Sequence, residues 1–156
     1  MLQHSPTSSL PHIIVGGTEE LRLSALATAA DLIGGAESGA KALLAEMGRA
    51  HVVADSEVPR NVVRMNSFVE FEIDGRDQRP VRLVFPVEAD ISRGKVSILT
   101  PIGAALIGLM PGQAMMVEAP DGKMHQVRVL SVAQLVDIQS SERNATPQAT
   151  EAAARA

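Results

Sequence analysis

Residues 81–130 read VRLVFPVEADISRGKVSILTPIGAALIGLMPGQAMMVEAPDGKMHQVRVL, and this stretch decides the fold of the chain. Apolar and polar side chains alternate over residues 81–85, which predicts a strand with one face on a core. A loop follows at residues 86–90, and Gly94 adds a turn signal. Residues 95–99 then predict a second strand. The first half of the stretch therefore predicts two strands joined by a loop.

The second half of the stretch predicts one short helix set between strands and turns. Thr100 is an N-cap residue, and Pro101 follows at the first helical position, where its missing N–H costs nothing. This helix is expected to close at Gly108. The dipeptides Pro111–Gly112 and Asp121–Gly122 are turn signals on either side of a further strand. Together they predict a helix of about two turns set between strands.

Alternation also marks the residues just upstream. Residues 69–73 place Val, Phe and Ile on one face and Glu70 and Glu72 on the other. Asp74–Gly75 predicts a turn toward the strand at 81–85, which carries Arg82 on its outer face. Opposed Glu and Arg side chains are expected to help fix the register, and a solvated sheet face is the preferred interpretation.

The first third of the chain has helical periodicity instead. Thr18 is the expected N-cap of a helix that stops at Gly34–Gly35, and a second helix is expected over residues 40–51. The short link predicts an antiparallel hairpin with arms of about 20 Å. Two apolar stripes on the first helix could pack on the second helix, on the sheet or on a second copy. They are Leu21, Ala25, Ala29 and Leu32, and Leu23, Leu26, Ala30 and Ile33.

These patterns predict an α+β protein, with a short N-terminal antiparallel helical hairpin followed by an antiparallel sheet that has one short helix. Polar, low-complexity sequence at both ends predicts disorder there. The expected division is a disordered N-terminus at 1–11, a helical hairpin at 12–55, a sheet domain at 60–137 and a disordered tail at 138–156.

Composition narrows the classes of function. The 156 residues are 46% hydrophobic but only 2% aromatic, which favours an aliphatic core and disfavours stacking on bases. A net charge of −4 gives no electrostatic footprint for nucleic acid, so a protein partner is the better expectation. The chain has no cysteine, no secretory signal pattern and no apolar run of membrane-spanning length. A cytoplasmic protein without membrane contact is therefore expected.

No catalytic or metal-binding constellation is evident in the sequence. The four histidines lie in different predicted elements without metal-ligand spacing, and no glycine pattern predicts a phosphate loop. Glu88 and Asp90 come closest to a paired-carboxylate site. Loop acids that cap turns and meet Arg93 or Lys95 are the better interpretation. The sequence therefore predicts neither an enzyme nor a bound cofactor.

Apolar side chains concentrate at the corner between the strand at 95–99 and the short helix. A helix of about two turns is too short to bury all of them, so some are expected to be exposed. Two interpretations stay open, a core cluster and a compact docking patch. The side chains concerned are Leu99, Ile102, Ala105, Leu106 and Leu109.

Three motifs in this stretch resemble one known family. They are FPVEAD at residues 85–90, GKVSI at 94–98 and PIGAALIG at 101–108. Their order resembles the C-terminal domain of the GreA and GreB transcription elongation factors, and still more that of the shorter Rnk-type members, called regulators of nucleoside diphosphate kinase. The resemblance implies an FKBP-like α+β domain that docks on RNA polymerase at the rim of the secondary channel. It implies an indirect effect on expression rather than contact with a kinase.

The same resemblance implies which residues bind the polymerase. They lie at the strand-to-proline corner and in the preceding loop, and are Leu99, Thr100, Pro101, Ile102, Ala105, Glu88 and Asp90. GreA and GreB commonly have Asp-Ser-Pro at that corner, whereas this chain has Leu99-Thr100-Pro101. An apolar side chain thus replaces an acid, as it also tends to do in Rnk-type members.

The helical hairpin departs further from the GreA and GreB pattern. Those factors hold a catalytic metal with two acids at the tip of a long coiled coil, whereas this short hairpin offers Asp31 and Glu37. The prediction is a regulator that competes with Gre-type factors for polymerase without stimulating transcript cleavage. The alternatives are an FKBP-like prolyl isomerase and a shortened GreA-type cleavage factor. A monomer is expected, although the sequence leaves the oligomeric state open.

Overall fold

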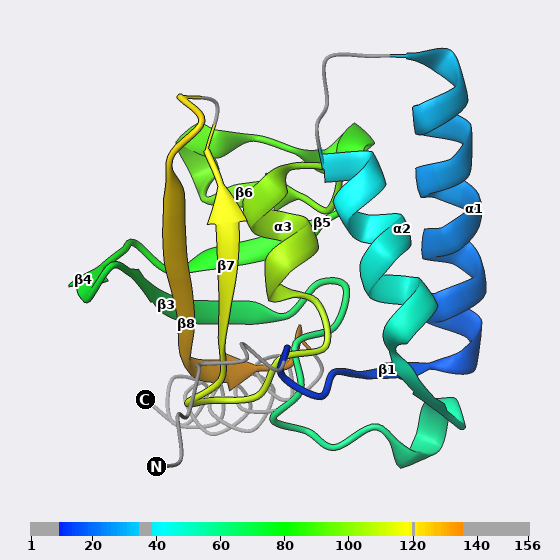
Figure 1. The fold of residues 1–156 in the computed structure, drawn as a ribbon. Helices are drawn as coiled ribbons and strands as arrows, with labels where there is room; N and C mark the ends of the chain where they lie inside the picture. Colours follow the sequence, from blue (N-terminus) through cyan, green and yellow to red (C-terminus); the bar gives the residue numbers. More distant parts are fainter. Residues whose placement is uncertain (1–9, 35–38, 120, 136–156) are drawn as a thin grey trace, which may run out of the picture.

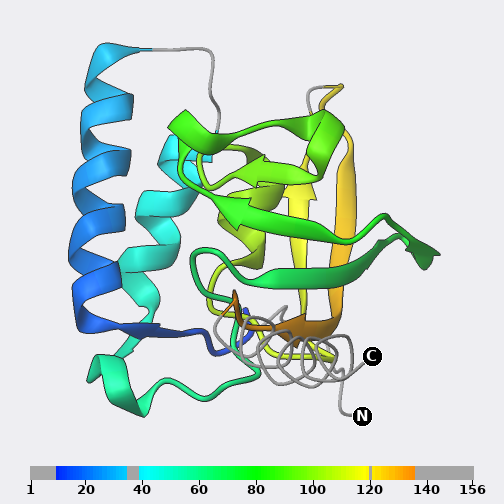
Figure 2. The same ribbon diagram turned by 180° about the vertical axis from the view of Figure 1, so that it is seen from behind.

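The computed structural model describes residues 10–34, 39–119 and 121–135. A helical hairpin lies along one side of a curled sheet that encloses a short helix (Figures 1 and 2). The hairpin and its flanking strands are β1 (Ile14–Gly16), α1 (Gly17–Ile33), α2 (Gly39–Arg49) and β2 (His51–Val53). The predicted α+β class is confirmed. The termini and Glu37 lie outside the described residues.

The open end of the hairpin is tied by a pair of short strands. β1 and β2 run parallel, with Ile14 opposite His51 and Gly16 opposite Val53. The second helix was expected to include His51, but α2 ends at Arg49. The reason is that His51, Val52 and Val53 pair with β1 instead, a conformation that suits the β-branched valines.

Helix α1 begins without a cap from its own first residues. Thr18 was expected as the N-cap, but the helix starts at Gly17 after Gly16, which has no side chain to cap it. The carboxylate of Asp55 accepts a hydrogen bond from the backbone N–H of Thr18 at 3.0 Å. Hydrogen bonds from Thr18 also lower the pKa of Asp55. The segment after β2 therefore supplies the cap that Thr18 was expected to provide.

The larger sheet has six strands in the order β6-β5-β3-β8-β7, with β4 paired to β3. Pairing is antiparallel throughout except between β5 and β6, which are parallel. A β-bulge lies between Glu70 and Phe71. The strands are β3 (Phe68–Ile73), β4 (Arg76–Asp77), β5 (Val81–Val84), β6 (Lys95–Ser97), β7 (Ala114–Glu118) and β8 (Met124–Ala133). Helix α3 (Pro101–Leu106) lies within the curl of this sheet (Figure 1).

The expected turn after β3 is present, but the expected Glu–Arg pairing is different. Asp74 and Gly75 both have positive φ, at 51° and 79°, as a two-residue hairpin turn of type I′ requires. Arg82 lies opposite Phe68, and its guanidinium is 5.7 Å from the ring centre. Glu72 instead meets Arg128 of β8 at 3.5 Å. The register between neighbouring strands determines which side chains face each other, and the sequence pattern alone does not give that register.

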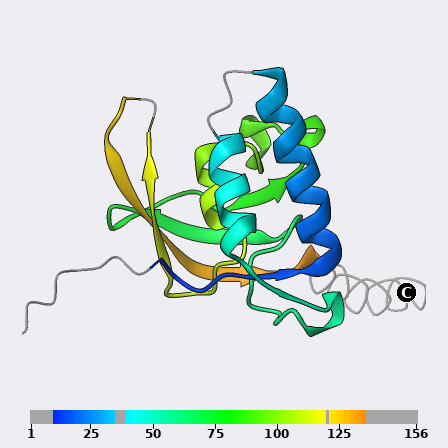
Figure 3. The ribbon, with the colours of Figure 1, turned by 45° about the vertical axis from the view of Figure 1, so that its right-hand side comes forward.

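One hydrophobic cluster runs through the hairpin and the sheet. Leu23 of α1, Leu43 of α2, Leu83 of β5 and Leu106 of α3 are all fully buried in it. Figure 3 shows α2 between α1 and the sheet. The hairpin therefore shares the core of the sheet and does not project away from it.

The two apolar stripes on α1 have different environments. In the second stripe Leu23 is buried and Leu26 and Ala30 are partly buried, whereas Ile33 is 84% exposed. In the first stripe Leu21 is 70% exposed and Leu32 is 82% exposed. The structure thus leaves one predicted stripe uncovered by the described residues. Within the same described ranges, no helix combines the length and apolarity that a bilayer span needs.

Candidate functional site

A groove of about 760 Å³ opens beside the start of α3. Its walls come from the loop before β6, the first turn of α3, and the end of β7 with the start of β8. Apolar side chains make up most of its lining, chiefly Ile73, Ile91, Val96, Ile102, Val117 and Val127. An exposed apolar concavity with a few polar groups is a typical site for binding a ligand or a partner.

The first turn of α3 forms one rim of the groove. The hydroxyl of Thr100 accepts a hydrogen bond from the N–H of Gly103 at 3.0 Å and donates one to the carbonyl of Ser97 at 2.7 Å. Pro101 occupies the first helical position, so the predicted cap and proline are both confirmed. Pro101 and Ile102 are half-buried and line the groove. The double hydrogen bond of Thr100 holds both side chains in a fixed corner.

Most of the apolar residues near this corner belong to the core. Leu99 and Ala105 are each 7% exposed, and Leu106 and Leu109 are fully buried. Leu99 is part of the hydrophobic cluster, and Gly39, at the start of α2, lies against its carbonyl oxygen. Of the two interpretations that the sequence left open, the core therefore describes most of these side chains. A direct role for Leu99 and Ala105 in partner binding stays a prediction that their burial does not favour.

Of the two acids in the preceding loop, Asp90 caps a turn and Glu88 does not. The loop forms two 3₁₀ turns, Pro86–Glu88 and Ile91–Arg93. Asp90 accepts hydrogen bonds from the N–H and hydroxyl of Ser92, and it meets Arg93 at 3.6 Å. Glu88 is exposed, and no described side chain pairs with it. The geometry of Asp90 is that of a cap, as expected.

Two exposed apolar residues of this loop were missed by the sequence reasoning. Val87 is 92% exposed and Ile91 is 86% exposed, and Ile91 lines the groove. Both lie within the motif FPVEADI, each next to an acid, so their apolar character in a polar loop was the available signal. With Pro101 and Ile102, Ile91 extends the apolar surface of the groove toward solvent.

Three ionisable residues also line the groove: Lys95, Glu118 and His125. His125 Nδ1 lies 2.6 Å from Asp74 Oδ2, and Asp74 Oδ1 accepts a hydrogen bond from the N–H of Gln126 at 2.8 Å. The hydrogen bond with His125 holds the pKa of Asp74 below its ordinary value. The turn at Asp74 is thereby fastened to β8 along one edge of the groove.

The Asp74–His125 contact leads to a prediction about acid stability. Because the pKa of Asp74 is lower in the folded than in the unfolded protein, its contribution is complete above about pH 4 and is lost as the pH falls further. Asp74→Asn keeps the size of the side chain and its tolerance of positive φ. We expect the stability of the parent to fall more steeply than that of Asp74→Asn between about pH 4 and pH 2.5. Urea unfolding followed by circular dichroism measures both slopes.

Asp77→Asn is the matched control, since Asp77 is exposed on β4 and no described side chain pairs with it. It is expected to follow the parent at every pH. Equal slopes for Asp74→Asn and the parent would contradict the assigned contact.

The hairpin tip offers little metal-binding chemistry among the described residues. Asp31 is exposed in the last turn of α1, and Glu37 lies outside the described residues. No group of three His, Cys, Asp or Glu side chains that could hold a metal ion occurs within residues 10–34, 39–119 and 121–135. Helix α1 has 17 residues, which gives a length of about 25 Å.

Comparison with known proteins identifies this combination of hairpin, curled sheet and groove. The family model "Transcription elongation factor, GreA/GreB, C-term" matches residues 58–134, which contain the whole groove. The regulator of nucleoside diphosphate kinase of Escherichia coli K12 is 37% identical over 94 residues, covering 60% of this chain and 69% of that protein. GreA of Thermodesulfovibrio yellowstonii is 35% identical over 91 residues, covering 58% of this chain but only 57% of that protein.

A solved structure agrees with the sequence relatives. A prokaryotic transcription elongation factor GreA/GreB from Nitrosomonas europaea superposes with a TM-score of 0.60 at 35% identity, covering 78% of this chain and 98% of that chain. The chain belongs to the GreA/GreB family of transcription elongation factors. The FKBP-like detail of the predicted fold stays a prediction.

Proposed function

We propose that this chain is a transcription regulator that binds RNA polymerase through the apolar groove beside α3. The groove lies wholly within residues 58–134, the part of the chain that matches the C-terminal model of the transcription elongation factors. It docks at the rim of the secondary channel, and it thereby competes with Gre-type factors for the same place. The single observation that carries this proposal is an exposed apolar groove at the corner of Thr100, Pro101 and Ile102.

Several features suit the groove to protein binding. Pro101 and Ile102 are held by the Thr100 cap, so their exposed surface is preorganised and loses little entropy on binding. Ile91 adds an apolar side chain that is 86% exposed and that a partner can bury. Central apolar anchors surrounded by polar groups are the usual source of affinity in such interfaces.

The short hairpin supports binding without stimulated transcript cleavage. A metal-dependent cleavage factor must carry a pair of acids into the polymerase active site, and a carboxylate needs partners to hold Mg²⁺ well. Asp31 is the one acid in the last turn of α1, a helix of about 25 Å that packs against α2. The chain therefore acts as an occupant of the channel entrance.

The groove gives less support to a prolyl isomerase. Such a site needs an apolar pocket that is usually lined by aromatic rings, and the chain has three phenylalanines. Phe71 is buried in the core, Phe85 lies 4.9 Å under the guanidinium of Arg22, and Phe68 lies under that of Arg82. None of the three lines the groove. The aliphatic lining of the groove therefore suits a protein-binding surface better than a prolyl isomerase site.

Ile102→Asp is expected to weaken binding to purified core RNA polymerase by at least about tenfold, because it places a charge where an apolar side chain must be desolvated. Fluorescence anisotropy of the labelled full chain measures the affinity. Leu21→Asp is the control, since Leu21 is exposed on α1 and is not part of the groove lining. It is expected to bind as the parent does.

Two further assays complete this test. The parent should displace a Gre-type factor from the polymerase and should leave the rate of transcript cleavage at its basal value. Absence of polymerase binding by the parent, or equal binding by a folded Ile102→Asp variant, would contradict the proposal. Stimulated cleavage would contradict its second part.

A further inference from the structure

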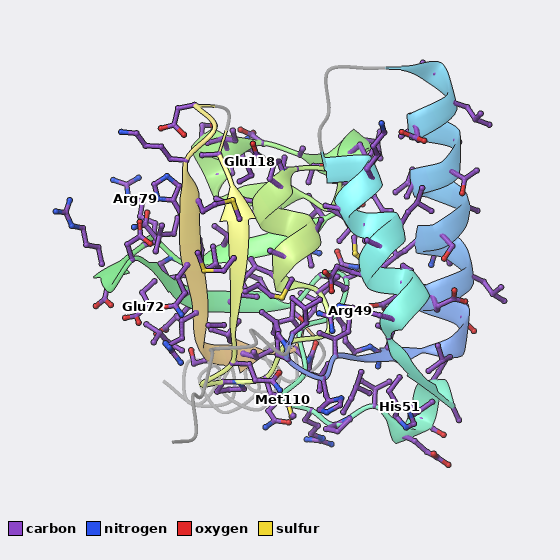
Figure 4. The ribbon with its side chains drawn as sticks, in the orientation of Figure 1. Arg49, His51, Glu72, Arg79, Met110 and Glu118 are labelled. Carbon is purple, nitrogen blue, oxygen red and sulfur yellow. The ribbon has the colours of Figure 1, made fainter. Side chains whose placement is uncertain are left out.

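Two charged side chains of opposite sign reach the groove from opposite ends of the sheet. Lys95 lies on β6 and Glu118 lies on β7, the two edge strands in the order β6-β5-β3-β8-β7. Both residues line the same groove because the sheet curls and brings its edges around α3 (Figure 1). Figure 4 shows Glu118 at the end of β7. The groove thus has a basic wall and an acidic wall.

These two charges are available to a partner. Within the described ranges 10–34, 39–119 and 121–135, no ion pair or side-chain hydrogen bond involves the ammonium of Lys95 or the carboxylate of Glu118. The neighbouring charges are already engaged, since Asp90 meets Arg93 and His125 meets Asp74. Lys95 is half-buried among apolar side chains, so its charge is less screened than one on an open surface.

We propose that Lys95 and Glu118 select and orient the polymerase segment that fills the groove. The segment carries an apolar side chain flanked by an acidic residue on one side and a basic residue on the other. The apolar side chain enters between Val96, Ile102 and Val117, the acidic residue meets Lys95, and the basic residue meets Glu118. This inference rests on the proposed function and deepens it, because it states the chemistry of the partner surface.

The arrangement assigns different tasks to the apolar and the charged residues. Burial of the apolar side chain supplies most of the affinity, as at other protein interfaces. Charges at the rim steer the encounter and penalise a reversed orientation, in which like charges would meet. A segment that entered the groove backwards would place its acid beside Glu118 and its base beside Lys95. The groove therefore accepts the segment in one direction.

The test uses reversal of each charge in the full chain, with binding to purified core RNA polymerase at low salt as the readout. Lys95→Glu and Glu118→Lys are each expected to weaken binding by about fivefold to tenfold, with the larger part in the association rate. Arg79→Glu and Glu57→Lys change the net charge by the same amounts at exposed positions outside the groove lining. These two controls are expected to bind as the parent does.

The double variant Lys95→Glu/Glu118→Lys separates local orientation from net charge. Its net charge equals that of the parent, so an effect of overall charge would cancel and binding would recover. The proposal predicts instead that the double variant binds in the parent's orientation no better than either single variant, because both walls then repel the segment. Parent-like binding by the folded double variant in the parent's orientation, read from a crosslink between a single cysteine placed beside the groove and the polymerase, would overturn this proposal alone. Absence of binding by the parent would overturn the proposed function together with it.

Discussion

Gly39→Ala and Gly103→Ala are each expected to destabilise the protein by at least about 3 kcal/mol, a large share of the stability of a typical domain. A Cβ atom on Gly39 would lie 1.9 Å from the carbonyl oxygen of Leu99. A Cβ atom on Gly103 would lie 2.1 Å from the carbonyl oxygen of Ser97. Both contacts are with backbone, which cannot rotate away as a side chain can. Urea unfolding followed by circular dichroism measures the loss.

Gly48→Ala provides a matched control in α2, the helix that Gly39 begins. A Cβ atom on Gly48 would have no neighbour within 4 Å, so alanine gains helix propensity without a clash. This variant is expected to stabilise the protein by about 0.5–1 kcal/mol. A Gly39→Ala variant as stable as the parent would contradict the close contact of α2 with the corner before α3. The opposite signs within one helix exclude a general effect of alanine on α2.

Features that depend on neighbouring residues could be predicted from the sequence. Thr100 caps α3 and Pro101 follows at its first position, because a cap and a helical proline act within one turn. Asp74–Gly75 forms the predicted turn after β3, because few residues tolerate its positive φ angles. The alternation of Val69 and Phe71 with Glu70 also placed the correct face of β3 on the core.

Features that depend on distant residues could not be predicted in the same way. The cap of α1 comes from Asp55, 37 positions from Thr18, and no local pattern indicates it. The groove is also non-local, because it requires the curl that brings β6 and β7 together. Leu99 was an expected docking residue but is buried in the hydrophobic cluster, and the sequence could not indicate that α2 begins against this corner. Ile91 was missed for the opposite reason, because none of the described residues covers its side chain.

Arg49 is the side chain that joins the hairpin to the sheet. Its guanidinium donates a hydrogen bond to the carbonyl of Pro11 at 2.6 Å, lies 3.6 Å from the sulfur of Met115 on β7 and forms an ion pair with Glu46. The side chain of Glu46 is only 11% exposed. Because burial removes most of the water from the Glu46 carboxylate, its charge needs the Arg49 guanidinium for stabilisation.

Arg49→Met is therefore expected to destabilise the protein by about 3–5 kcal/mol, since it leaves the buried carboxylate of Glu46 unpaired while keeping an apolar stem of similar length. The double variant Glu46→Leu/Arg49→Met removes both charges and is expected to recover to within about 1 kcal/mol of the parent. Urea unfolding of the parent, both single variants and the double variant gives the coupling free energy. If Arg49→Met lowers the free energy of unfolding by less than about 1 kcal/mol, the ion pair adds as little to stability as an exposed surface ion pair does.

The double variant also distinguishes two sources of the stability at this joint. If the ion pair only compensates the burial of its own charges, apolar replacements restore the protein, because Leu and Met can fill the same space beside Met115. If the hydrogen bond from Arg49 to Pro11 is needed as well, the double variant stays destabilised by the cost of that lost bond, about 1–2 kcal/mol. A stable double variant is expected to bind polymerase as the parent does, because neither Glu46 nor Arg49 lines the groove. Loss of binding in that variant would mean that the placement of the hairpin against the sheet also contributes to docking.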